Sequence, residues 1–180
     1  MKLERCAELL VPIRHRQQNR PATVAELASL LADPPRVLRQ LLSRELLEPL
    51  PEPGRFLYIP RPLELPGLRL APQVHFCAQW QAPVLAISLI DYELPQLASL
   101  ASKIRYGFAA ELQTSERGLA LRAQATLELA TGAGGLGLPQ PVLAFLGHRT
   151  LELIFGRLER RCRRNLPGLL PQQGGLGAEH

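Results

Sequence analysis

The chain has 180 residues, an apolar content of 46% and a formal net charge of +5, which is the composition of an ordinary globular protein. No apolar run approaches the roughly 18 residues of a membrane span, and the start MKLERCAELL lacks the cleavage site of a secretory signal. The lack of a long apolar run predicts no membrane partner. Three widely spaced cysteines (Cys6, Cys77 and Cys162) without a CxxC pair predict a reducing, cytoplasmic environment and no ready metal site.

Residues 2–17 are predicted to form the first helix. Their apolar side chains recur at the three-and-four spacing of one helical face, and Pro21 follows as a stop signal. Cys6 falls on this face and is interpreted as a small core residue, as is Cys162 near the other end of the chain. The residues that define the face are Leu3, Cys6, Leu9, Leu10 and Ile13.

Two short helices are predicted next, over 23–31 and 34–46. Thr23 precedes Glu26 by three residues, which is the spacing of a capping box. Asp33 can cap the second of these helices, and Pro34 suits its first turn because a proline there loses no hydrogen bond.

The stretch LEPLPEPGRFLYIP then predicts a small hairpin. Its prolines limit the first strand to a short edge strand, and Pro53–Gly54 is a turn signal. Residues 55–59 form the β-prone return strand. Three helices followed by a hairpin, within residues 1–60, predict an N-terminal domain of their own.

Residues 20–60 resemble the winged helix-turn-helix superfamily found in many bacterial transcription regulators, through the helix around VAELA, the tight turn, the helix over 34–46 and the hairpin as a wing. The resemblance implies that the 34–46 helix enters the major groove of DNA. A protein-docking or merely solvated outer face is the alternative, because Glu48 and Glu52 lie in the wing. By position, the groove-facing residues would be Arg36, Arg39, Gln40 and Ser43, and the phosphate contacts would be Arg44 and Arg55.

The rest of the chain predicts a proline-rich connector (61–83), a helical domain (84–165) and a flexible tail (166–180). Residues 84–90 are either a strand or the start of a buried helix. A long helix over 95–131 and a last helix over about 141–164 are expected to pair, so the predicted fold class is mainly α. Trp80 and Tyr92 are interpreted as core residues, and a ligand pocket is the alternative for them.

The run RLERRCRR near the end of the last helix has two interpretations. Its arginines either complement the carbonyl end of the helix or form a phosphate-contacting patch. GAGGLG at 132–137 matches the letters of a dinucleotide fingerprint but is preceded by a helical pattern, so it is interpreted as an interhelical loop. The arginines of the run that join the predicted nucleic-acid site are Arg157, Arg160, Arg161 and Arg164.

The leading functional hypothesis is a duplex-DNA-binding transcriptional regulator that acts through the 34–46 helix. The alternative is a non-catalytic accessory subunit of a larger DNA- or RNA-processing assembly, with the winged helix docking on protein. The expected partner is double-stranded DNA, and either a homodimer or a protein complex is left open. A ligand-sensing function of residues 61–165 is compatible with both. No catalytic constellation is visible, so we expect neither an enzyme nor a cofactor.

Overall fold

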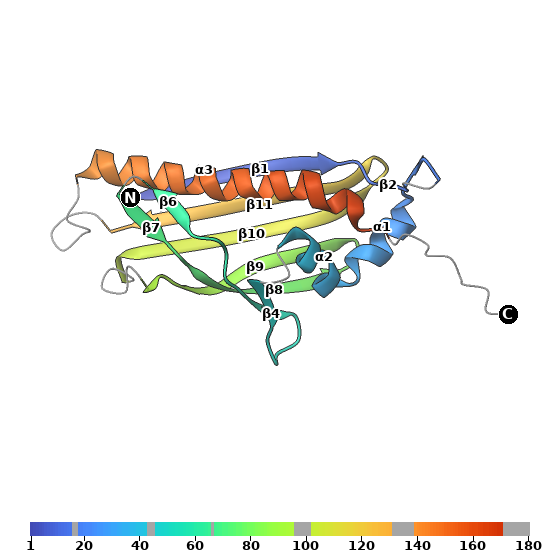
Figure 1. Cartoon of the computed structure of the whole chain (residues 1–180), viewed down its shortest axis with the longest axis horizontal. Coiled ribbons are helices and arrows are strands. Elements are labelled where there is room, and N and C mark those ends of the chain that lie inside the picture. Colours follow the sequence, from blue (N-terminus) through green and yellow to red (C-terminus); the bar gives the residue numbers. More distant parts are fainter. Residues whose placement is uncertain (16–17, 43–45, 66, 96–101, 131–138, 171–180) are drawn as a thin grey trace.

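Seven antiparallel strands form one sheet, and a single long helix lies along one face of it (Figure 1). The structure is a computed structural model that describes residues 1–15, 18–42, 46–65, 67–95, 102–130 and 139–170. The spatial order of the strands is β1-β11-β10-β9-β8-β5-β4, so the first and last long strands are neighbours. They are β1 (Lys2–Val11), β4 (Leu47–Pro49), β5 (Arg55–Tyr58), β8 (Gln73–Gln81), β9 (Val84–Glu93), β10 (Ile104–Ser115) and β11 (Gly118–Leu129).

The mainly α fold class predicted from the sequence is wrong, and the segment 95–131 shows why. Its described residues form the hairpin of β10 and β11 instead of a helix. Apolar residues four apart share a face on a helix, but they also share a face on a strand, because four is a multiple of two. The informative positions lie two apart: Leu121, Ala123 and Ala125 are buried while Arg122 and Gln124 between them are exposed, which is the alternation of a strand. Residues 96–101 of the predicted helix lie outside the described residues.

The predicted first helix, 2–17, is also a strand over most of its described length. Strand β1 pairs with β11 from Lys2 to Val11, and its odd-numbered residues beyond Arg5 face the core. Its outward side chains meet charges on β11: Glu8 pairs with Arg122 at 2.9 Å between Oε1 and Nε. Cys6 is exposed on this outer face, so its interpretation as a core residue is wrong. The charged residues of this segment, which in the sequence resemble the solvated side of a helix, therefore lie on one face of the sheet.

The two short helices predicted after Pro21 are present. Helix α1 (Val24–Leu31) has the full capping box of Thr23 and Glu26, and the Asp33 side chain caps α2 (Pro34–Leu41). Helix α2 ends at Leu41, where Leu42 is extended, so it is shorter than the predicted 34–46 helix; residues 43–45 lie outside the described residues.

These helices nevertheless do not belong to a winged helix-turn-helix. Both pack on the sheet, and their apolar side chains share one hydrophobic core with β8, β10 and β11. The predicted wing is a real hairpin of β4 and β5, but β5 also pairs with β8, so the hairpin is one end of the seven-stranded sheet with β4 as its edge strand. Strands β1, β4 and β5 of the segment 1–60 are therefore integral to a sheet that extends to residue 129. The resemblance is confined to the local sequence pattern, and the described residues do not form a winged helix-turn-helix.

The predicted connector, 61–83, holds β6 (Leu63–Leu65), β7 (Leu68–Leu70) and all of β8. Strands β6 and β7 form a separate hairpin, and a second small ladder joins β2 (Arg14–His15) to β3 (Arg20–Pro21). Residues 84–90, for which strand and helix were both open, form part of β9.

Helix α3 (Gln140–Asn165) matches the last predicted helix closely and continues into a short 3-10 helix (Leu166–Gly168). It packs on β1 and β11, and Gly147 lies against side chains of both strands. A Cβ atom at Gly147 would overlap the Leu3 side chain and lie 3.2 Å from Leu127 Cδ2. Within the described ranges, no helix has both the length and the apolar character needed to cross a membrane. The face of the sheet that α3 covers is called the inner face below.

Candidate functional site: an apolar cavity under helix α3

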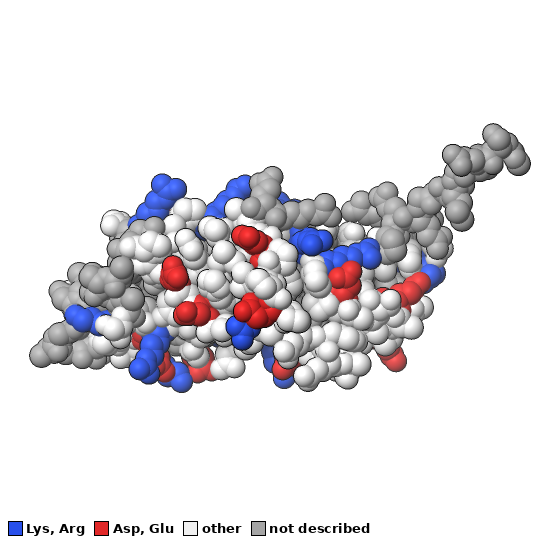
Figure 2. Space-filling view, turned by 90° about the horizontal axis from the view of Figure 1, so that it is seen from below, with Lys and Arg blue, Asp and Glu red and all other residues white. Residues whose placement is uncertain are grey.

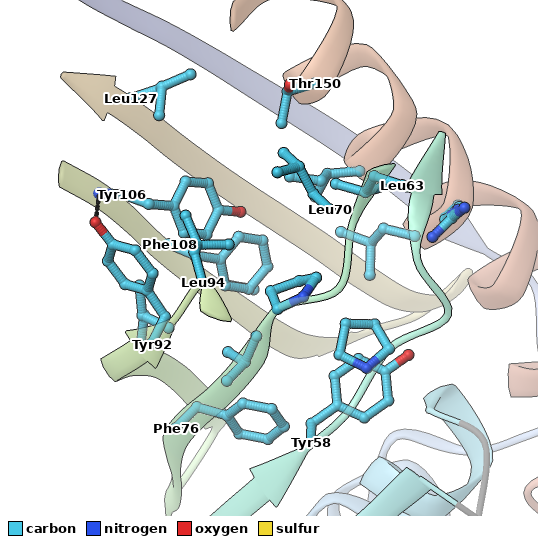
Figure 3. A pocket seen from close by; sticks show the side chains of 18 of the residues that line it. Tyr58, Leu63, Leu70, Phe76, Tyr92, Leu94, Tyr106, Phe108, Leu127 and Thr150 are labelled. Carbon is cyan, nitrogen blue, oxygen red and sulfur yellow. Dashed lines mark hydrogen bonds between the residues drawn. The ribbon is translucent and has the colours of Figure 1, made fainter. Parts of the chain in front are cut away.

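A cavity of about 340 Å³ lies between the inner face of the sheet, helix α3, helix α2 and the β6–β7 hairpin (Figure 3). Leucine, isoleucine, valine, phenylalanine and proline side chains form most of its wall. Six lining residues carry polar side-chain atoms, and no Asp, Glu, His or Cys of the described residues is among them. These six are Tyr58, Tyr92, Tyr106, Thr150, Arg157 and Arg161.

The wall follows from the alternation of the long strands. Every second residue of β10, from Ile104 to Leu112, lines the cavity, while the residues between them face outward. Ala110 is the smallest side chain in this row and is 4% exposed, whereas its neighbour Ala109 is exposed on the outer face. Strand pleating therefore turns a period-2 sequence into one apolar wall and one solvated wall.

A β-bulge in β9 brings Tyr92 into this wall. His75 of β8 pairs with Asp91 and Phe76 pairs with Leu89, which leaves Ile90 as the extra residue. One extra residue reverses the alternation, so the inward positions change from odd numbers to even numbers. Leu89 and Tyr92 both line the cavity as a result, and Asp91 stays on the outer face.

Tyr92 also joins two strands that have separated. Strands β9 and β10 are paired only between Val84–Ser88 and Ala109–Gln113. Beyond this ladder the Tyr92 hydroxyl donates to the Ile104 carbonyl oxygen at 2.7 Å and accepts from the Tyr106 amide at 3.0 Å. A side chain thus supplies the hydrogen bonds that a ladder would have made.

The Tyr106 hydroxyl is a polar group without a partner among the described residues. Its ring packs edge-on against Tyr92 with centroids 6.0 Å apart, and its oxygen points into the cavity (Figure 3). Burial raises the pKa of both Tyr106 and Tyr92. Both hydroxyls therefore stay protonated at neutral pH, and that of Tyr106 is available as a hydrogen-bond donor.

Two arginines of α3 line the cavity near the C-terminal end of the helix. Arg161 Nη1 donates to the Tyr58 hydroxyl at 2.7 Å. Arg157 donates to the carbonyl oxygens of Arg61 and Pro62, at 2.7 and 2.8 Å, and so fastens the segment before β6 to the helix.

The β6–β7 hairpin covers one side of the cavity. Its buried residues Leu63, Leu65 and Leu70 form a small cluster of their own with three side chains of α3. Leu63, Leu65 and Leu70 also line the cavity, so this hairpin is both a wall and a cover. The three α3 residues are Leu146, Leu153 and Ile154.

Helix α2, which the resemblance assigned to the DNA groove, is docked on the end of α3. Arg36 Nη2 donates to the Leu169 carbonyl oxygen at 2.8 Å, and Gln40 Nε2 donates to that of Asn165 at 3.2 Å. Asn165 returns a bond to the Gln40 carbonyl oxygen at 2.9 Å. Two of the proposed base-reading side chains thus have structural roles. Arg39 is exposed, and Ser43 and Arg44 lie outside the described residues.

The predicted functions of transcriptional regulator and of winged-helix docking subunit are therefore wrong, together with duplex DNA as the partner. There is no separate winged helix among the described residues, and the helix meant to dock is already packed against α3. Arg55 is exposed on the hairpin edge. On the face that Figure 2 shows, basic and acidic side chains alternate with broad uncharged areas and do not gather into a basic patch.

The arginines of the run 157–164 lie on two sides of α3, one facing solvent and one facing the cavity. Arg160 and Arg164 are exposed, and Arg157 and Arg161 are half-buried against the cavity. Cys162 is fully buried between them, as predicted, and burial raises the pKa of its thiol to about 12. The GAGGLG stretch lies outside the described residues.

Most of the residues that line the cavity were not predicted from the sequence. Tyr92, interpreted as a core residue, lines it, while Trp80 is half-buried against the core. Tyr58 and Tyr106 received no role, although Tyr106, Phe108 and Ala110 alternate in the manner of a half-buried strand. Elsewhere in the described ranges, no group of three His, Cys, Asp or Glu side chains is arranged to hold a metal ion.

A scan of protein-family models and a search of curated proteins both find no match. Solved structures similar to the chain include the ZhuI aromatase/cyclase from Streptomyces sp. R1128, with 13% identity, a TM-score of 0.45 and coverage of 98% of this chain and 99% of that chain. The di-domain aromatase/cyclase StfQ of the steffimycin pathway has 14% identity and a TM-score of 0.48, over 91% of this chain and 50% of that one.

A major latex-like protein from Panax ginseng has 8% identity and a TM-score of 0.37, over 87% of this chain and 97% of that one. With every identity this low and every TM-score below 0.5, we take no function from these structures. The cavity itself supplies the functional argument.

Proposed function

We propose that the chain binds a small, mainly apolar organic molecule in the cavity between the sheet and α3, and that it does so without catalysing a reaction. The observation that carries the proposal is a space of about 340 Å³ inside an otherwise apolar core. Protein interiors are normally packed as densely as organic crystals, with voids rarely larger than a water molecule. A space of this size falls within the range of small-molecule pockets.

The composition of the wall supports the same function. Ligand pockets combine an apolar wall with a few placed polar groups that fix orientation. Here the polar groups are the free hydroxyl of Tyr106 at one side and the Tyr58–Arg161 pair at another. Transfer of an apolar ligand from water to such a wall is favourable at roughly 25 cal/mol per Å² of buried apolar surface.

The proposal of binding without catalysis rests on the same residues. The described wall offers no carboxylate, imidazole or thiol, and burial, which raises the pKa of Tyr92 and Tyr106, keeps these two hydroxyls protonated. General-base chemistry near neutral pH needs a group whose pKa lies close to the working pH. We also propose a cytoplasmic location, because Cys6, Cys77 and Cys162 are all free thiols.

The test is binding of the neutral fluorophore N-phenyl-1-naphthylamine to the full chain and to Ala110→Phe. The added ring fills part of the cavity from the centre of β10, so we expect one binding site in the parent and an affinity at least about tenfold lower in the variant, a difference of roughly 1.4 kcal/mol. Ala109→Phe is the matched control, since it places the same ring on the outer face of the same strand. Equal binding by the two variants would show that the cavity is not the site.

A further inference from the structure

Arg161 has no carboxylate partner among the described residues, although it is half-buried and lines the cavity. Five other arginines form ion pairs with Glu side chains, in the pairs Arg20–Glu26, Arg69–Glu64, Arg122–Glu8, Arg149–Glu152 and Arg163–Glu159. Arg161 is half-buried, and its hydrogen bond within the described residues goes to the neutral Tyr58 hydroxyl. Its Nε and Nη2 groups have no partner there.

The surroundings of Arg161 make this pairing unusual. It lines a cavity whose described wall contains no acidic side chain. Removing a charge from water is costly unless an opposite charge or hydrogen bonds replace the lost hydration. Arg157, one helical turn earlier, uses both terminal nitrogens on backbone carbonyl oxygens, which leaves Arg161 as the cation with donors to spare.

The Tyr58 hydroxyl completes a site for an anion. Because this oxygen accepts from Arg161, its own proton remains free to donate toward the cavity. The unused N–H groups of this guanidinium and the adjacent hydroxyl can both donate to a carboxylate, and hydrogen bonds from a guanidinium to a carboxylate are among the strongest in proteins. Tyr58 is 9% exposed, so a bond made there is shielded from water.

We infer that the ligand is an amphipathic carboxylate, with an apolar body in the cavity and a single carboxylate held by Arg161 and Tyr58. This inference rests on the proposed function and names the chemistry of its ligand. The apolar body extends across β8 and β9 toward Tyr106 on β10. Three strand spacings separate β5 from β10, which is at least about 14 Å, because β9 and β10 are not paired beside Tyr106. An unbranched acid of medium chain length spans that distance.

The experiment compares decanoate with decan-1-ol, which has the same chain and no charge. Dissociation constants for both are measured by calorimetry at pH 7.5 on the full chain, and the readout is their ratio. A charge-assisted pair of this kind favours decanoate by about 10- to 100-fold. In Arg161→Met we expect this ratio to approach the value set by the alkyl chain alone. General damage to the cavity weakens the binding of both ligands equally and therefore leaves the ratio unchanged.

Arg160→Met is the matched control, since it removes the same charge from the adjacent, exposed position of α3. The inference requires that this variant keep the ratio of the parent. If Arg161→Met does not fold, Tyr58→Phe replaces it, because the buried ring is kept and only the hydroxyl is lost; it lowers the ratio severalfold.

The outcomes separate the two proposals. Equal affinity of the parent for the acid and the alcohol overturns the inference and supports an apolar cavity. If the ratio falls equally in Arg160→Met and Arg161→Met, the inference is also overturned, because the preference for the acid then comes from the overall positive charge and not from a specific contact. Binding of neither compound nor of N-phenyl-1-naphthylamine overturns the proposed function itself.

Discussion

At the scale of single residues, Gly118 permits the β10–β11 turn to lie against the end of β1. Its φ is +135°, a conformation that side chains with a Cβ rarely adopt. A Cβ built there would overlap the Val11 carbonyl oxygen and lie 2.9 Å from Pro12 Cα. Both obstacles are backbone atoms, so no side-chain rotation relieves them. This glycine therefore fixes how closely two distant segments approach.

We expect Gly118→Ala to lower the free energy of unfolding by about 1–3 kcal/mol, through strained backbone and the collision with β1. Gly156→Ala is the control, because Gly156 lies inside α3 with no atom within 4 Å of its would-be Cβ. That change should raise stability by up to about 1 kcal/mol, since alanine is the better helix former. Urea unfolding of the three proteins gives both values, and two changes of the same sign would contradict this account.

At the scale of elements, Glu26 connects α1 to the β2–β3 ladder. Its carboxylate accepts from Arg20 Nη2 at 2.8 Å and from the Thr23 amide at 2.8 Å, and His15 Nε2 lies 3.1 Å away. The Arg20 guanidinium contributes most, followed by the Thr23 amide and His15, to a Glu26 pKa far below its usual range. The capping box seen in the sequence is thus part of a larger junction that only the fold completes.

This junction predicts a pH dependence with a definite sign. A carboxyl whose pKa is lowered on folding stabilises the fold above its unfolded pKa of about 4.3, and this contribution is lost as the pH falls through that value toward the folded pKa. Between pH 6 and pH 3 the parent should therefore lose more stability than Glu26→Gln, in which the carboxyl is absent. Thermal melts at several pH values measure the difference.

Arg20→Met is the matched variant for this prediction, because it removes the largest cause of the shift and leaves the capping box in place. It should reduce the same pH dependence. Parallel stability curves for the parent and Glu26→Gln across this range would contradict the proposed role of the carboxylate.

At the scale of the whole molecule, the cavity exists because separate elements close around it without filling it. The sheet supplies the floor, α3 lies over one side, and the β6–β7 hairpin covers another (Figure 1). The hairpin touches the rest of the molecule mainly through α3, by its leucine cluster and the two bonds from Arg157. The position of the hairpin over the cavity therefore depends on these contacts with α3.

Arg157→Met should loosen this cover without unfolding the sheet. We expect faster amide hydrogen exchange in residues 61–70 by a factor of about 10, as for the loss of one or two hydrogen bonds. Exchange in β10 and β11 should stay as in the parent. Arg149→Met, which breaks an exposed ion pair on the same helix, is the control. Faster exchange throughout the sheet would instead assign Arg157 to global stability.

What the sequence determined by itself was local. The capping box of Thr23 and Glu26, the Asp33 cap, the hairpin turn at Gly54 and the last helix depend on neighbours within a few residues, and all are present in the structure. The choice between helix and strand for β1, β10 and β11 depended on pairing partners up to 126 positions away, as between Lys2 and Glu128. A spacing of four residues satisfies both structures. The alternation at Leu121, Ala123 and Ala125 favours a strand, and the ladders with β1 and β10 complete that choice.

The site was decided entirely at the tertiary level. Tyr58, Tyr106 and Arg161 come from two strands and a helix, and nothing in their sequence spacing brings them to one cavity. The bulge at Ile90, which turns Tyr92 inward, is likewise visible only in the pairing of β8 with β9. Periodicity records which side of an element is buried, but it does not record which elements enclose a space between them. That depends on how the sheet, α3 and the β6–β7 hairpin pack together.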